Sequence, residues 1–179
     1  MKNKPKRVVY NRLMVEFMKQ FVIILIFLLF SVKGFSTQQV EDYLIFNKDT
    51  LYFYEFPDYI NSPLEQIIIT LGHIINPNVI SSGCWRGYYA EWKIIDSTLY
   101  LSKVFDCFTR EVVKNNIVEK AIGRKFTNGL LKADWVNGNF SCGKVRILSL
   151  YISTYRHNFK FLIVNGKIIK EEYYTSCMI

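Results

Sequence analysis

Hydrophobic and polar positions alternate along most of the chain beyond residue 42, and short polar turns separate the alternating segments. Residues 42–46 and 51–56 read as two strands joined by a polar turn at 47–50, with apolar or aromatic side chains on both faces of the second strand. In residues 88–95, Tyr88, Ala90, Trp92 and Ile94 fall on one face. Asp96-Ser97-Thr98 then predicts a turn, and residues 99–102 a return strand.

Two Asn-Gly pairs predict two further hairpins. The tripeptide Val-Asn-Gly occurs at 136–138 and at 164–166, each time between segments that resemble strands. Asn-Gly is the strongest short hairpin signal, because both residues tolerate a positive φ angle. We therefore interpret the repeat as one turn sequence used twice.

Helical signals are limited to two short segments. In residues 62–76, Ser62 can cap a helix, Pro63 suits its first position, and apolar residues follow at helical spacing up to Leu71. This segment predicts a helix that ends near Gly72 or at residues 76–77, although its β-branched run also suits a strand. Residues 117–122 predict a second helix. The predicted class is α+β: mainly antiparallel β-hairpins, as a meander or a partly open barrel, after an apolar leader helix.

Residues 1–36 form a separate leader in this interpretation. A basic stretch precedes an apolar run of 12 residues, 21–32, which is short of the ~20 needed to cross a bilayer. The leader predicts a signal peptide cleaved after Ser36 or, alternatively, an uncleaved N-terminal membrane anchor. Translation starting at Met18 would also give an ordinary signal peptide. Residues 37–179 then form a single domain.

Charge separates the leader from this domain. The whole chain has a net charge of +8, but residues 1–36 hold seven of the 23 Lys and Arg and one of the 15 acids. Residues 37–179 therefore carry 16 bases and 14 acids, a net charge of +2. Nucleic-acid binding needs a basic patch on the folded domain, so this distribution disfavours it. We expect an unidentified protein or envelope component as partner, and membrane contact only through the N-terminal segment.

The four cysteines, Cys84, Cys107, Cys142 and Cys177, all follow the leader. In an exported domain, four cysteines allow two disulfides in three possible pairings. The wide spacing, with no CxxC pair, disfavours a zinc site and a thioredoxin-like redox site. Buried free thiols are the alternative for some of them.

No catalytic or cofactor motif is present in the sequence, so we predict no cofactor, no metal site and no enzymatic activity. His73 has apolar neighbours and is expected to be packed, whereas His157 lies in a polar turn. Adjacent acids such as Glu41-Asp42 should face opposite sides of a strand. A carboxylate-dependent hydrolase that uses Glu91, Asp96 and Asp134 is an alternative. Glu91 and Asp134 each adjoin a tryptophan, which can raise a carboxyl pKa, but each also suits an acid on the exposed face of a half-buried strand.

Arg86, Tyr88 and Trp92 are the candidate ligand-binding residues. An arginine beside aromatic rings can hold an anion or stack on a ring. The competing interpretation is structural: Arg86 would pair with a carboxylate such as Asp134.

These residues also carry a resemblance. Arg86-Gly87-Tyr88, Ala90, Trp92, Ile94 and Leu99-Tyr100-Leu101, followed by Ala133-Asp134-Trp135, resemble a family of small uncharacterised bacterial proteins. The resemblance covers roughly residues 42–170, with its motifs at 84–101 and 133–138. The chain departs from the family pattern at Asp96-Ser97, where Asp-Gly is usual, and in its leader. The resemblance implies no activity. We expect an exported or envelope-associated, non-catalytic binding protein; the alternatives are an immunity-type protein that neutralises a toxin, and the hydrolase.

Overall fold

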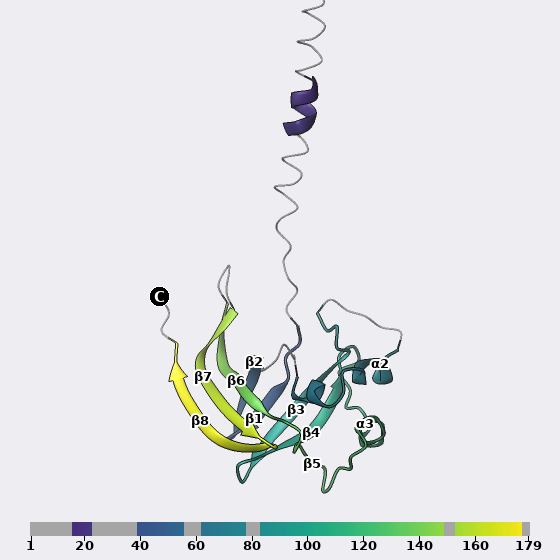
Figure 1. Cartoon of the computed structure of the whole chain (residues 1–179), viewed down its shortest axis with the longest axis vertical. Helices are drawn as coiled ribbons and strands as arrows, with labels where there is room; N and C mark the ends of the chain where they lie inside the picture. Colours follow the sequence, from purple (N-terminus) through teal and green to yellow (C-terminus); the bar gives the residue numbers. More distant parts are fainter. Residues whose placement is uncertain (1–15, 23–38, 56–61, 78–82, 149–152, 177–179) are drawn as a thin grey trace, which may run out of the picture. The chain divides into compact units, whose positions relative to one another are not determined.

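The computed structural model describes residues 16–22, 39–55, 62–77, 83–148 and 153–176 (Figure 1). The chain divides into two units, Met1–Thr37 and Gln38–Ile179. In the first unit, residues 16–22 form a helix, and the rest of the predicted leader lies outside the described residues. Among the described helices, none is both long and apolar enough to span a membrane. The signal peptide and the anchor therefore stay predictions.

The second unit consists mainly of strands, which confirms the predicted β-rich α+β class. Its elements are β1 (Tyr43–Phe46), β2 (Asp49–Glu55), a 3₁₀ helix (Pro63–Gln66), α2 (Leu71–Ile75), β3 (Tyr88–Ile95), β4 (Thr98–Asp106), α3 (Asn115–Ile122), β5 (Leu131–Lys132), β6 (Gly138–Leu148), β7 (Ser153–Val164) and β8 (Lys167–Thr175).

One sheet joins all eight described strands in the order β3-β1-β2-β6-β7-β8-β4-β5, and β4 also pairs with β3. The β1–β3 pair is parallel, and the other pairs are antiparallel. Because β4 pairs with both β8 and β3, the series of strand pairings leads back to β3, where it began. The pairing between β4 and β8 is short: Thr98 and Lys167 are its only register pair among the described residues. Figure 1 shows β6, β7 and β8 side by side as strongly curved strands.

Three predicted hairpin turns are confirmed. Both central residues of each turn have positive φ angles. These are 51° and 69° at residues 47–48, 48° and 56° at residues 96–97, and 48° and 72° at residues 165–166. Positive φ at both central residues is the signature of the type I′ turn, whose twist matches that of the flanking strands.

The predicted hairpin at Asn137-Gly138 is wrong. β5 ends at Lys132 and pairs with β4, whereas β6 begins at Gly138 and pairs with β2 and β7. Asn137 instead makes tertiary hydrogen bonds: its amide donates to Gln66 Oε1 at 2.8 Å, and its Oδ1 accepts from the Asn165 amide at 2.8 Å. The two Val-Asn-Gly segments thus contact each other, because long-range bonds outweigh the local turn preference of the first.

The predicted first helix is two short pieces. Ser62 caps the 3₁₀ helix as expected, since its Oγ accepts from the Leu64 amide at 3.2 Å. The residues Ile67–Thr70 are not helical, and α2 begins only at Leu71. The β-branched run, which disfavours a helix, occupies this break. Contrary to expectation, His73 is exposed. The second predicted helix is confirmed as α3, which ends at Gly123 with φ 69°.

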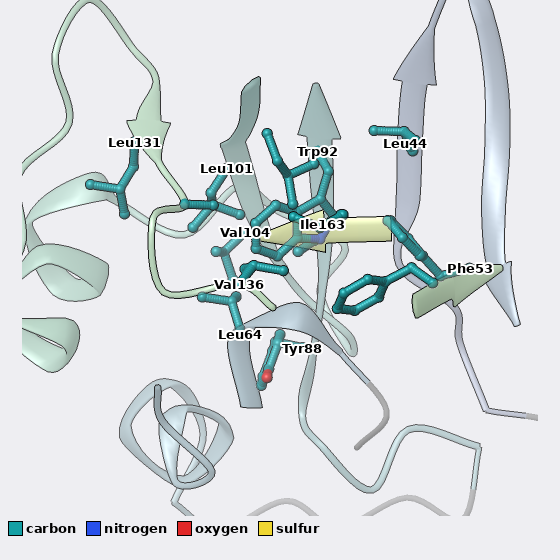
Figure 2. Packing of buried hydrophobic residues seen from close by; sticks show 14 of the residues in the cluster. Leu44, Phe53, Leu64, Tyr88, Trp92, Leu101, Val104, Leu131, Val136 and Ile163 are labelled. Atoms are coloured by element: carbon teal, nitrogen blue, oxygen red, sulfur yellow. The ribbon is translucent and has the colours of Figure 1, made fainter. Parts of the chain in front are cut away.

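The core lies between the inward faces of the strands and the short helices. Figure 2 shows Trp92, Leu101, Val104 and Ile163 packed together, with Leu44 and Phe53 beside them. The fully buried members include Leu44, Leu51, Phe53, Leu64, Leu71, Tyr88, Ala90, Trp92, Leu99, Leu101, Val118, Phe140 and Phe161. Predicted inward positions of the β3–β4 hairpin are therefore confirmed.

One disulfide is present among the described cysteines. Cys84 and Cys107 are bonded, with 6.3 Å between their Cα atoms, and they join the two open ends of the β3–β4 hairpin. Cys142 is a buried free thiol whose pKa is raised by burial. Cys177 lies outside the described residues. The structure thus shows one disulfide, with Cys142 as a buried free thiol, which the sequence analysis gave as the alternative for some of the cysteines.

Candidate functional site

The three predicted site residues meet at one buried carboxylate, Asp42. Arg86 NH1 lies 3.1 Å from Asp42 Oδ1, and the two side chains are 2% and 0% exposed. The second guanidinium nitrogen of Arg86 donates to the Val40 carbonyl at 2.8 Å. The structural interpretation of Arg86 as the partner of a carboxylate is confirmed. That carboxylate is Asp42 and not the suggested Asp134, which pairs with Arg124 on the surface.

Asp42 accepts three further hydrogen bonds. Its Oδ2 accepts from Trp92 Nε1 at 3.0 Å and from the Ser62 hydroxyl at 2.6 Å, and its Oδ1 accepts from the Ala90 amide at 3.1 Å. A buried charge is stable only when it is paired and hydrogen-bonded. The donors to Asp42 come from the loop before β3, from β3 itself and from the segment before the 3₁₀ helix. This carboxylate therefore ties three parts of the domain together.

Tyr88 completes this Asp42 cluster. The Arg86 guanidinium carbon lies 5.3 Å from the centre of its ring, within the range of a cation–π contact. Its hydroxyl is buried. Burial, followed by the charge of Asp42, raises the pKa of Tyr88. Tyr88 is therefore neutral in the cluster.

Close backbone packing explains the glycine between Arg86 and Tyr88. Gly87 has φ 75°, and a Cβ added there would lie 3.2 Å from the Cα of Gly72 in α2. A Cβ on Gly72 would come within 1.6 Å of the Arg86 carbonyl oxygen. The Arg-Gly-Tyr sequence thus serves helix–strand packing and the Asp42 cluster. The structure brings Arg86, Tyr88 and Trp92 together as partners of a buried acid, and their assignment as ligand-binding residues stays a prediction.

A second group of aromatic side chains lies on the outward face of the sheet. We call it the tyrosine face, and its members are Tyr43, Tyr52, Tyr54, Tyr89, Phe105, Tyr155 and Tyr174. They come from β1, β2, β3, β4, β7 and β8. Within β2, the inward neighbours Leu51 and Phe53 are buried, whereas Tyr52 is 42% exposed. Tyr174 is 40% exposed.

The rings of the tyrosine face are in contact from strand to strand. Tyr89 stacks on Phe105 with 4.9 Å between centroids, and Tyr43 lies 6.5 Å from Tyr89 and 6.4 Å from Tyr52. Tyr155 stacks on Tyr52 at 6.3 Å and on Tyr54 at 5.3 Å. The Tyr54 hydroxyl lies 3.1 Å from the Tyr174 hydroxyl. Since aromatic contacts at these distances are favourable, the row holds its own conformation.

Glu91 anchors one end of the tyrosine face. Its carboxylate accepts from the Tyr43 hydroxyl at 2.9 Å and from Ser102 at 2.8 Å, with Lys93 and Lys103 at 3.6 and 3.7 Å. Burial acts to raise the pKa of Glu91, but these hydrogen bonds and lysine charges outweigh it and lower the pKa. The raised pKa that the hydrolase alternative invoked is therefore not found at Glu91.

Glu41 anchors the middle of the row at Tyr155. It accepts from the Tyr155 hydroxyl at 2.5 Å, and Arg146 NH2 lies 3.3 Å from it. Burial, and then the contact with Glu41, raises the pKa of Tyr155. The ring of Tyr155 also lies over Gly143, where an added Cβ would be 2.1 Å from it. Glu41 and Asp42 thus face opposite sides of the sheet, as predicted for adjacent strand positions.

The sequence contains signals for part of the Asp42 cluster and for part of the tyrosine face. Asp42 shares its alternation with Leu44 and Phe46, so it is a charge on an inward face, which needs a partner. The aromatic outer face of β2 was predicted, but not its continuation, because that depends on which strands become neighbours. Of the three acids of the hydrolase alternative, Glu91 lies in the tyrosine face, Asp134 pairs with Arg124, and Asp96 lies in the β3–β4 turn.

No family, curated protein or solved structure matches the chain. No group of three or more potential metal ligands occurs within the described ranges. The functional argument therefore comes from the chain's own surface.

Proposed function

We propose that this chain is an exported or envelope-associated bacterial protein without catalytic activity, which binds a protein partner through the tyrosine face. The observation that carries the proposal is the row of contacting rings across the outward side of the sheet, in which Tyr52 and Tyr174 are exposed and Tyr155, which links Tyr52 to Tyr54, is buried.

The composition of this face suits protein recognition. Tyrosine and arginine are enriched in the centres of protein interfaces, and charged residues gather at the rim. Here two charged groups adjoin the tyrosines: Glu91 with its lysines beside Tyr43, and Glu41 with Arg146 beside Tyr155. The rings are already packed, so binding would immobilise few side chains. The partner's complementary surface would be apolar at its centre and would carry charges of both signs at its edge.

The leader and the disulfide support export. A basic stretch followed by 12 apolar residues is typical of a signal peptide, and the anchor remains the alternative. The Cys84–Cys107 bond suits an oxidising compartment, since cytosolic thiols are kept reduced. Cell fractionation with N-terminal sequencing tests this part. We expect an envelope or secreted protein beginning near Thr37, or at Met1 or Met18 if anchored; a cytosolic protein with reduced Cys84 and Cys107 would contradict it.

A partly open barrel is our proposal for the finer fold. The ring of strand pairings supports it, because it closes through β3–β4 and is narrow at β4–β8. Such a ring gives the tyrosine face a fixed curvature, since neighbouring strands hold each other at a set twist.

Site-specific photo-crosslinking in the cells of origin tests the binding proposal. A photoreactive phenylalanine analogue replaces Tyr52 or Tyr174 in turn, with Ile69, which is 74% exposed, as the matched control position. We expect one discrete protein adduct from both face positions and none from Ile69. Adding Tyr174→Ser to the Tyr52 crosslinker should remove the adduct. The absence of an adduct at the face, or the same adduct at Ile69, would refute the proposal.

An immunity-type protein is the special case in which the crosslinked partner is a toxin. Mass spectrometry of the adduct decides that point, because it identifies the partner directly.

A further inference from the structure

A surface cleft of about 590 Å³ lies on a part of the domain that the tyrosine face does not use. Its walls come from the loop after α3, from β5 and from the adjoining end of the β3–β4 hairpin. The residues that determine its chemistry are Tyr100, Arg124, Lys125, Leu130, Lys132 and Asp134.

Arg124 is held in place at this cleft. It follows Gly123, whose φ of 69° ends α3 and turns the chain toward the cleft. Its guanidinium pairs with Asp134 and lies 5.2 Å from the centre of the Trp135 ring. A guanidinium fixed by a carboxylate and an aromatic ring loses little further freedom when it binds a ligand. Arg124 remains 38% exposed in this arrangement, so it is accessible.

The cleft carries a local excess of positive charge. Lys132 lies opposite Tyr100 in the β4–β5 register, so both side chains share one face. Throughout the described part of the chain, Lys125 and Lys132 form no ion pair with a carboxylate. The lining of the cleft has a formal charge of +2, because it contains three bases, Arg124, Lys125 and Lys132, and one acid, Asp134. That equals the net charge of all of residues 37–179.

We propose that this cleft binds an organic oxyanion, meaning a phosphate, sulfate or carboxylate group joined to an apolar or aromatic part. The planar guanidinium of Arg124 can donate two parallel hydrogen bonds to such a group, and the lysines add point charges. Tyr100 and Leu130 offer apolar surface to the rest of the ligand, as is usual for small-molecule sites. The inference is independent of the tyrosine face, which shares no residue with the cleft.

Titration of the ¹⁵N-labelled full-length protein, kept in solution with an uncharged detergent, tests the proposal by NMR. The probes are phenyl phosphate, inorganic phosphate and benzyl alcohol. We expect phenyl phosphate to shift the amides of residues 124–134, with at least fivefold higher affinity than inorganic phosphate, and benzyl alcohol to leave them unshifted. Equal affinities, binding of benzyl alcohol, or shifts spread over the whole surface would overturn the proposal.

Charge-matched variants separate the cleft from general electrostatics. Lys125→Met/Lys132→Met should raise the Kd for phenyl phosphate at least tenfold, because methionine keeps the apolar stem and removes the charge. Lys114→Met/Lys120→Met removes the same charge from exposed positions outside the cleft and should change the Kd by less than twofold. Equal losses in the two variants would contradict a built site.

Discussion

Removal of the Asp42 carboxylate should destabilise the domain far more than removal of an exposed acid. Asp42→Ala would leave Arg86 buried without its partner, and Ser62 and Trp92 without their acceptor. Breaking a buried ion pair from one side costs about 3–5 kcal/mol. The whole stability of an average domain is about 5–15 kcal/mol, so this single change removes a large part of it.

The assay is urea unfolding followed by the fluorescence of the buried Trp92. With an m-value of about 2 kcal/mol/M, a loss of about 4 kcal/mol lowers the midpoint by about 2 M. The matched control is Asp49→Ala, since Asp49 pairs with Lys144 but the two side chains are 46% and 41% exposed. An exposed pair contributes about 0–1 kcal/mol, so the control midpoint should move by less than about 0.5 M.

A double-mutant cycle isolates the interaction itself. Asp42→Ala/Arg86→Met removes both charges, so it should be less destabilising than the sum of the two single changes. This comparison remains informative if Asp42→Ala alone does not fold, because the double variant should then recover folding. Equal midpoints for Asp42→Ala and Asp49→Ala, or strict additivity in the cycle, would refute the account of the cluster.

Three further outcomes follow from the same contacts. Gly72→Ala should prevent folding or strongly lower the Tm, because its Cβ would lie 1.6 Å from the Arg86 carbonyl oxygen. Thermal unfolding measures the Tm, and an unchanged Tm would contradict this expectation. Cys84→Ser/Cys107→Ser should lower the free energy of unfolding by about 3 kcal/mol, because it removes a cross-link between residues with a sequence separation of 23. Urea unfolding measures this loss, and adding reductant to the unmodified protein should lower its free energy of unfolding by the same amount. The lowered pKa of Glu91 means that its stabilisation is full above the ordinary pKa of 4.5 and is lost as pH falls through the folded-state value. Glu91→Gln should therefore flatten the decline of stability below about pH 4.5, as measured by urea unfolding across pH; an unchanged decline would contradict this.

Local patterns predicted the strands well because alternation and turn chemistry act over a few residues. The turns at 47–48, 96–97 and 165–166 followed from such signals. The Asn137-Gly138 turn failed because Gln66 and Asn165, both distant in sequence, provide competing hydrogen bonds. The helix over 62–76 failed where its β-branched residues lie, so an opposing local signal was present there.

The candidate site shows the same limit. Arg86 and Trp92 could be identified from their residue types, but their common partner Asp42 lies 44 and 50 residues away, respectively. Strand order brings Asp42 to them, through the parallel β1–β3 pair, and no local pattern encodes that order. For the same reason the tyrosine face could be predicted within β2 but not across six strands.

The most direct test of the central claim is the affinity of the crosslinked partner, once isolated, for variants of the tyrosine face. Tyr52→Ala/Tyr174→Ala removes the two exposed rings of the tyrosine face, and Ile69→Ala/Ile169→Ala removes two apolar side chains elsewhere that are more exposed still. We predict at least a tenfold rise in Kd for the tyrosine variant, about 1.4 kcal/mol, and less than a twofold change for the isoleucine variant, with both proteins folded. An unchanged Kd for the tyrosine variant, or an equal loss in both, would contradict recognition through this face.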